Sequence, residues 1–271
     1  MEIQRVWAAY FSPTGTTEKV VSHIAGHLAK PMNCSVLPFD FTLPHARQDR
    51  MRFQSRDLVV FGVPVYAGRV PNVLLKYLNT LEGNGAMAVP VVLFGNRNYD
   101  EALKELRNLL ELRGFQTVAA GAFVGEHSFS RTLGQGRPDA EDLSVASEFA
   151  ARIFDTLDVG LIMSPVLLDN EGPLGEYYQP RDQDGNPIDI RKVRPKVRDH
   201  CSNCGYCALM CPMGSINPEN VRDFIGICIK CGACVKKCPV EARYYDEESY
   251  LYHKYDLEQT YTRRAEPVVF L

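Results

Sequence analysis

The sequence has 271 residues, of which 45% are hydrophobic and 23% are charged, and its formal net charge is −3 at pH 7. This length suits one large domain or two modest ones, and the composition is that of an ordinary globular protein. The small net charge argues against nucleic-acid binding and against attachment to a membrane surface. The most apolar stretch, residues 85–95, is shorter than the roughly 18 residues that cross a bilayer, and the first residues lack a secretory signal. We therefore expect a soluble, cytoplasmic protein with no membrane span.

From residue 1 to about 160, short apolar runs alternate with helical patterns, which is typical of an α/β domain with a parallel sheet. The expected strands cover residues 3–10, 34–39, 57–63, 89–95 and 117–124. The expected helices cover residues 16–30, 71–81, 100–113 and 139–157. Five strands with interleaved helices fit the doubly wound strand order 2-1-3-4-5, in which ligands bind beyond the carboxyl ends of the strands.

The loop after the first strand carries hydroxyl side chains where a helix begins, in the order Ser12-Pro13-Thr14-Gly15-Thr16-Thr17. Backbone N–H groups at a helix N-terminus, with hydroxyls around them, can bind a phosphate without a lysine. A plain turn with threonine caps is the alternative. The loop has no Walker lysine and no G-x-G-x-x-G pattern, so it is neither a P-loop nor a dinucleotide fingerprint.

The loops after the third and fourth strands each combine a tyrosine with small and polar residues. Their candidate ligand-binding residues are Pro64, Val65, Tyr66, Ala67 and Gly68, followed by Gly95, Asn96, Arg97, Tyr99 and Asp100. The two tyrosine rings could stack on a planar ligand, and backbone groups of the small residues could bind its polar edge. After the fifth strand, His127 is either a proton donor to a substrate or a loop residue with a hydrogen-bond role. We assign no catalytic residue.

Eight of the nine cysteines lie between residues 201 and 238. The pattern C-x2-C-x2-C-x3-C-P occurs twice, with its cysteines at Cys201, Cys204, Cys207 and Cys211 and again at Cys228, Cys231, Cys234 and Cys238. Three cysteines spaced two residues apart can wrap one iron–sulfur cubane while the fourth points away. Zinc instead favours two C-x2-C pairs that lie about a dozen or more residues apart. The ninth cysteine, Cys34, falls in an expected strand and is interpreted as an inert buried thiol.

Residues 191–245 contain ten Lys or Arg against four Asp or Glu. Such an excess occurs in nucleic-acid patches, but eight cysteine thiolates in the same segment also require compensating positive charge. We favour the second explanation and expect no nucleic-acid partner.

Residues 197–245 resemble bacterial-type ferredoxins, which carry two [4Fe–4S] clusters. The resemblance implies that the fourth cysteine of each run ligates the cluster of the other run. One cluster is then held by Cys201, Cys204, Cys207 and Cys238, and the other by Cys228, Cys231, Cys234 and Cys211.

Residues 1–160 resemble flavodoxin, through the Ser-x-Thr-Gly-x-Thr pattern after the first strand and the two aromatic-bearing loops. This second resemblance implies one FMN. Its phosphate would lie at Ser12, Thr14, Gly15, Thr16 and Thr17, and its ring at the ten residues named from the other two loops.

The two parts together resemble flavodoxin–ferredoxin fusion proteins. We expect an FMN domain at residues 1–160, a Pro/Gly-rich linker at 161–196, a ferredoxin domain at 197–245 and a tail at 246–271. The tail is either a strap packed on the body or a partner-binding segment. The predicted function is single-electron transfer between two [4Fe–4S] clusters and FMN, and on to a redox protein or a small molecule. The alternative is a flavin-dependent reductase of a quinone or nitro compound. The sequence leaves open whether the protein is an enzyme, the direction of electron flow and the oligomeric state, a homodimer included.

Overall fold

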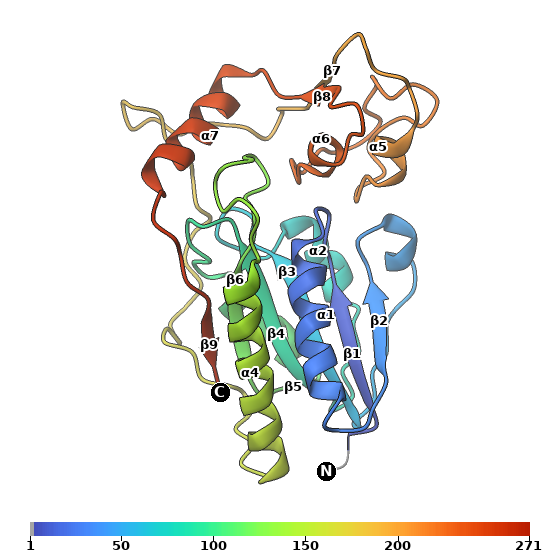
Figure 1. Cartoon of the computed structure of the whole chain (residues 1–271), viewed down its shortest axis with the longest axis vertical. Helices are drawn as coiled ribbons and strands as arrows, with labels where there is room; N and C mark the ends of the chain where they lie inside the picture. The colour runs from blue at the N-terminus through green and yellow to red at the C-terminus, as the bar shows by residue number, and fades with distance from the viewer. Residues whose placement is uncertain (1–2) are drawn as a thin grey trace.

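The computed structural model describes residues 3–271, and its core is one twisted sheet with helices on both faces (Figure 1). The strands are β1 (Arg5–Tyr10), β2 (Val36–Asp40), β3 (Asp57–Pro64), β4 (Met87–Phe94), β5 (Gln116–Thr117), β6 (Ala120–Val124) and β9 (Val268–Phe270). The helices of this part are α1 (Thr16–Ala29), α2 (Asn72–Leu78), α3 (Ala102–Leu112) and α4 (Ala140–Asp158), with a 3-10 turn at Pro44–Arg47.

The sheet order is β2-β1-β3-β4-β6-β9, and all pairs from β2 to β6 are parallel. The expected flavodoxin-like order 2-1-3-4-5 is therefore confirmed. Side chains alternate between the two faces of a strand, and β3 shows the consequence. Val59, Phe61 and Val63 join the core on the side of α2 and α3, whereas Leu58 and Val60 join the core on the side of α1 and α4.

Two details of the sheet differ from the five expected strands. The fifth strand is split into β5 and β6, which pair separately with β4. The C-terminal β9 then adds an antiparallel edge strand, with Val269 opposite Gly121 of β6. An exposed edge offers unpaired backbone groups, and β9 covers the edge that β6 would otherwise present.

The tail also contains a helix that was not expected, α7 (Glu248–Thr260). Its buried residues are Tyr250, His253 and Leu257, which lie on one face because they are three and four positions apart. The sequence hid this helix because only one of these three is aliphatic. Figure 1 shows the tail running from α7 down the side of the domain to β9, so it packs on the body as a strap.

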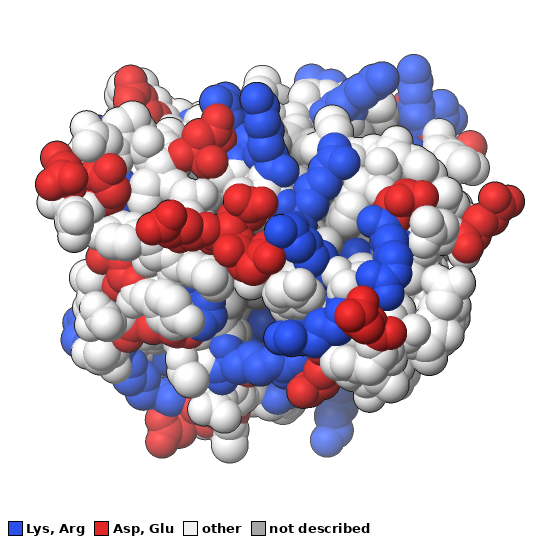
Figure 2. Space-filling view, turned by 90° about the horizontal axis from the view of Figure 1, so that it is seen from above, with Lys and Arg blue, Asp and Glu red and all other residues white. Residues whose placement is uncertain are grey.

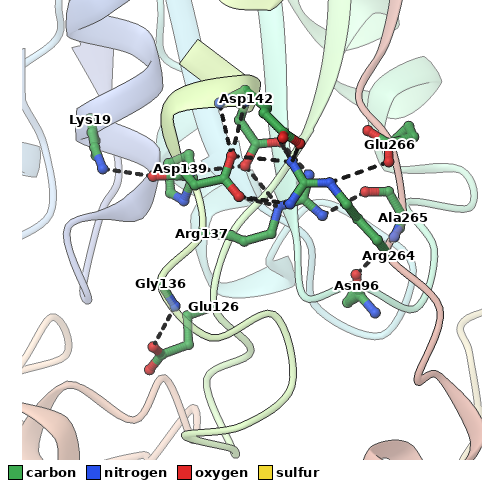
Figure 3. A network of polar contacts seen from close by, with 12 residues as sticks. Lys19, Asn96, Glu126, Gly136, Arg137, Asp139, Asp142, Arg264, Ala265 and Glu266 are labelled. Atoms are coloured by element: carbon green, nitrogen blue, oxygen red, sulfur yellow. Dashed lines mark hydrogen bonds and ion pairs between the residues drawn. The ribbon is translucent and has the colours of Figure 1, made fainter. Parts of the chain in front are cut away.

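Asn96 and Arg137 anchor the chain between α7 and β9 (Figure 3). The Asn96 side chain donates from Nδ2 to the carbonyls of Tyr261 at 2.7 Å and Arg263 at 2.8 Å, and its Oδ1 accepts from the backbone of Ala265 at 3.0 Å. Arg137 donates to the Ala265 carbonyl at 2.6 Å. The side chain of Asn96 is thus a structural anchor, although its residue lies in a predicted ligand loop.

The segment between the sheet domain and the cysteine module lies against the sheet domain. Residues 161–195, all of them described, form no helix or strand. The segment is held by the Val166 backbone, which donates to Thr117 at 2.8 Å, and by the Tyr178 backbone, which donates to Ala67 at 2.9 Å. An ion pair of 2.5 Å joins Arg107 to Glu171. Within residues 3–271, every helix is too short or too polar to cross a bilayer.

We predict that Asn96→Asp destabilises the fold by about 2 kcal/mol, because it removes two donated hydrogen bonds and sets a carboxylate against two carbonyls. Chemical denaturation monitored by circular dichroism measures the change. Asn98→Asp is the matched control, since Asn98 is exposed and uses only its Oδ1, which an aspartate keeps. Equal stability of the two variants would contradict the anchoring role.

Candidate functional site

The cysteine module lies over the carboxyl ends of the parallel strands (Figure 1). Its elements are the short helices α5 (Tyr206–Leu209) and α6 (Ala233–Lys236) and the antiparallel pair β7 (Lys196–Val197) and β8 (Arg243–Tyr244). In a doubly wound sheet this edge is where ligands bind. The module therefore faces the three loops that the sequence singles out.

The eight cysteines of the module surround two cavities that are partly open to solvent. The first, which we call the outer cavity, is lined by Cys201, Cys204, Cys207 and Cys238, with Cys234 at its boundary. The second, which we call the inner cavity, is lined by Cys211, Cys228, Cys231 and Cys234. Cys211 thus lines the same cavity as the second run and Cys238 the same cavity as the first, while Cys234 lines both. The crossed ligand sets expected from the sequence stay a prediction.

The repeated sequence builds two equivalent half-sites. Gly205 and Gly232 follow the second cysteine of each run, and both have φ of 75° at the start of a short helix. This left-handed backbone is strained for residues with a side chain. The two half-sites also agree after the fourth cysteine of each run. The Ser215 backbone donates to Cys211 Sγ and the Ala242 backbone donates to Cys238 Sγ, both at 3.3 Å. Backbone donors of this kind stabilise the charged sulfurs of a cluster.

The chemistry of the donor set fits iron–sulfur clusters. Burial raises the pKa of the Cys231 thiol to about 12 and also raises the pKa values of Cys228 and Cys234. A buried thiolate is costly by itself, but a coordinating metal deprotonates the thiol outright. Figure 2 shows Lys and Arg side chains in a band over this end of the molecule, as expected from the positive excess of residues 191–245.

The inner cavity lies against the sheet domain, and the outer cavity is turned to solvent. Arg47 donates to the carbonyl of Pro212, next to Cys211, at 2.5 Å. A Cβ on Gly232 would overlap the carbonyl of Ser128, so the two parts touch through backbone. Ile229 packs against the core on the α2 and α3 side. By contrast, Cys204 of the outer set is exposed.

Among the predicted ligand residues, Tyr66 has a pKa that is affected by cysteines of the inner cavity. Its pKa is raised well above the usual value, first by burial and then by the negative charges that Cys231 and Cys228 would carry as thiolates. Tyr66 belongs to the tight turn after β3, in which its backbone and that of Arg69 exchange two hydrogen bonds of 2.9 and 3.1 Å.

The loop between β1 and α1 has free donors and open space. The Ser12 Oγ accepts from the backbone of Glu18 at 3.0 Å, while the backbone N–H groups of Thr16 and Thr17 find no acceptor within residues 3–271. A Cβ on Gly15 would meet nothing within 4 Å in the same described part. Unpaired N–H groups at the start of a helix of 14 residues suit a phosphate group.

The loops after β3 and β4 are in contact with each other. A Cβ on Gly68 would overlap the Asp100 carboxylate, and Arg97 forms an ion pair with Asp100. The Arg97 guanidinium also lies over the Tyr178 ring at 3.9 Å, a contact that the sequence did not indicate. The Tyr99 ring packs against Phe94, with 5.7 Å between ring centroids. Tyr99 therefore contacts the end of β4, whereas Tyr66 belongs to the turn after β3.

His127 lies between these loops and the cysteine module. Burial, the main cause, and the nearby His253, Lys236 and Arg97 lower its pKa to about 3. Its Nδ1 accepts from the backbone of Phe129 at 3.1 Å, so the neutral ring carries its proton on Nε2. A neutral imidazole in this position favours the hydrogen-bond role over proton donation by an imidazolium.

The cysteine module is similar to known iron–sulfur domains. Residues 200–244 match the family model described as a 4Fe-4S dicluster domain. Over 45 residues the chain is 42% identical to the pyruvate synthase subunit PorD of Methanothermobacter marburgensis. That match covers 17% of this chain and 54% of the relative, so it spans about half the relative's length.

Among solved structures, the chain is similar to flavodoxin 1 from Bacillus cereus, at 18% identity and a TM-score of 0.41, with 56% of this chain and 98% of that chain covered. A flavodoxin from the domain Archaea gives 12% identity and the same TM-score, with 57% and 99% covered. The fold assignment itself comes from the strand order of the sheet.

The chain thus combines a sheet domain of strand order 2-1-3-4-5 with a segment, residues 200–244, that matches a 4Fe-4S dicluster domain. In particular, the chain is a fusion of an N-terminal part with a flavodoxin-like fold and a C-terminal 4Fe–4S dicluster ferredoxin domain.

We predict that Cys211→Ser damages the cluster held by the second cysteine run, because Cys211 lines the inner cavity. Iron content should fall by roughly half, and the cluster of the first run should persist. Iron analysis and EPR of the reduced protein measure both effects. Cys34→Ser is the control, since the Cys34 thiol donates to the carbonyls of Ile3 and Met32 and packs against the core of the sheet domain, outside the cysteine module. Spectra identical to those of Cys201→Ser would contradict the crossed ligand sets.

Proposed function

We propose that this protein moves single electrons between a redox partner and an FMN through two [4Fe–4S] clusters, in the order partner, outer cluster, inner cluster, flavin. The observation that carries the proposal is the contact of the second cysteine run with the loop after β6, where Lys236 donates to Glu126 at 2.5 Å and to the His127 carbonyl at 2.7 Å, at the edge of the sheet where ligands of this fold bind. The same path serves electron flow in either direction.

The clusters would be held by the four cysteines of each cavity, with Cys201, Cys204, Cys207 and Cys238 on the outer one and Cys211, Cys228, Cys231 and Cys234 on the inner one. The repeated backbone donors to Cys211 and Cys238 support two equivalent clusters. In this proposal the FMN domain ends near residue 160, and the ferredoxin domain covers residues 197–245.

The FMN phosphate would bind at the N-terminus of α1, where the backbone N–H groups of Thr16 and Thr17 and the hydroxyls of Ser12, Thr14 and Thr16 can donate. The ring would lie along the loops after β3 and β4. Bound FMN accepts one or two electrons and so complements one-electron clusters. The side chain of Asn96 is engaged by the tail, so its backbone is the part left to contact the ring.

A redox partner would exchange electrons at the outer cluster, because Cys204 is exposed there, whereas Cys231 of the inner set is only 8% exposed. The partner is a redox protein or a small electron donor or acceptor. A reducing compartment such as the cytoplasm would keep the eight thiols available for iron.

The reductase alternative requires a substrate to reach the flavin ring. The cysteine module lies over the edge of the sheet that carries the flavin loops (Figure 1), where Gly232 touches Ser128 of the loop after β6, and this arrangement favours an electron carrier. His127 is neutral and already bonded through Nδ1, which also weakens its case as a proton donor.

We predict that the double variant Thr14→Val, Thr16→Val loses affinity for FMN by about tenfold or more, because two hydroxyl donors to a dianion disappear. Iron content should stay unchanged. Fluorescence titration of the flavin-free protein with FMN measures the affinity. Thr156→Val, on the distant part of α4, is the control. Unchanged affinity in the double variant would mean that the phosphate binds elsewhere.

A second prediction concerns the rate of electron transfer. When a strong donor reduces the clusters in a rapid-mixing experiment, the FMN should be reduced at a rate independent of protein concentration, because both centres belong to one chain. Flavin absorbance at several protein concentrations measures this rate. A rate that rises in proportion to concentration would show that electrons reach the flavin only between molecules.

A further inference from the structure

Arg243 is a buried cation for which the sequence analysis found no role beyond general charge balance. It lies in β8 opposite Val197 and is only 4% exposed. Its Nη2 donates to Cys207 Sγ at 3.3 Å and to the carbonyl of Val221. Its Nε and Nη1 are buried and have no hydrogen-bond partner within residues 3–271.

This arrangement is unfavourable for the chain alone. Burying a charged group without an opposite charge costs several kcal/mol, and each unsatisfied buried donor adds to the cost. Arg243 has no carboxylate partner within the described residues 3–271, and its side chain lines the outer cavity. The missing anion therefore belongs in that cavity.

The other half-site provides an internal comparison. Arg243 follows Cys238 by five positions, and Ile216 follows Cys211 by five. The two positions are structurally equivalent, because the preceding residues Ala242 and Ser215 make the same backbone bond to a cysteine sulfur at 3.3 Å. Arg243 lines the outer cavity, whereas Ile216 lines the inner one. The repeat thus places a cation at one cluster and an aliphatic side chain at the other.

We propose that Arg243 makes the two clusters inequivalent by raising the reduction potential of the outer cluster, so that the outer cluster is reduced first. This inference rests on the proposed function. Gaining one electron makes a thiolate-bound cluster more negative, so a fixed cation beside it stabilises the reduced form more than the oxidised form. Hydrogen bonds to cluster sulfurs and net charge are among the factors that set such potentials.

Arg243 acts mainly on the outer cluster. Its hydrogen bond goes to Cys207 of the outer set, and its side chain lines the outer cavity and is not among the residues that line the inner one. Cys234 lies at the boundary of both cavities. The effect on the inner cluster is therefore present but smaller.

An anaerobic redox titration of the full-length, cofactor-loaded protein, followed by EPR, tests the proposal. In Arg243→Met the midpoint of the cluster reduced first should fall, and the other midpoint should fall less. The first midpoint of Arg243→Lys should lie between those of the wild type and Arg243→Met, because lysine keeps the positive charge but lacks the planar guanidinium group. Arg198→Met is the control, since Arg198 is exposed and lies over the Tyr244 ring at 4.4 Å. It should leave both midpoints within error of the wild type.

Unchanged midpoints in Arg243→Met, or shifts no larger than in Arg198→Met, would overturn the proposal. If Arg243→Met does not retain its clusters, Arg243→Lys is the deciding variant. A first midpoint of Arg243→Lys equal to that of the wild type would then overturn the proposal. Iron, sulfide and flavin are measured on the same samples. A wild-type protein with only one cluster would refute the proposed function itself, whereas normal contents with unchanged midpoints would refute only the role of Arg243.

Discussion

The contact between α6 and the loop after β6 fixes how the two parts of this molecule meet. The Lys236 ammonium donates to Glu126 at 2.5 Å and to the His127 carbonyl at 2.7 Å, and both side chains are largely shielded from water. An ion pair in such a position depends on both partners, because losing one leaves the other charge buried. Lys236 is the last residue of α6, two positions after Cys234. Its contact therefore holds the second cysteine run against the loop after β6.

The sequence was sufficient for the features that arise from short-range patterns. The spacing of the eight cysteines predicted an iron–sulfur module where residues 200–244 match a 4Fe-4S dicluster domain, and the alternation of apolar and helical segments predicted the sheet order. Both patterns express local constraints, namely the size of a cubane and the pleat of a buried strand. The Ser12–Thr17 loop was located for the same reason, because a helix start with unpaired donors is visible in the sequence.

Features that depend on distant parts of the chain were missed. The sequence did not indicate that Asn96 binds the tail near Ala265, or that Arg97 packs on Tyr178, because 169 and 81 positions separate these pairs. Helix α7 was missed because its buried face is formed by a tyrosine, a histidine and a leucine, which carry little hydrophobic signal. Arg243 stood in the sequence as one of ten basic residues, and only its burial and unpaired donors distinguish it from the others.

The two half-sites show how a repeated sequence can serve two roles. Their glycines and backbone donors are equivalent, so both are built to hold the same kind of group. Their surroundings are not equivalent, since the inner cavity contacts the sheet domain and the outer cavity faces solvent. A carrier that receives electrons from outside and delivers them to an internal flavin needs such a difference.

The most direct test of this account is the crystal structure of the protein loaded with iron, sulfide and FMN under anaerobic conditions, with the irons located by anomalous scattering. The account predicts iron in both cavities and a flavin ring at the loops after β3 and β4, with Tyr66 between the ring and the inner cluster. Iron in a single cavity, or a flavin bound away from Tyr66, would contradict it.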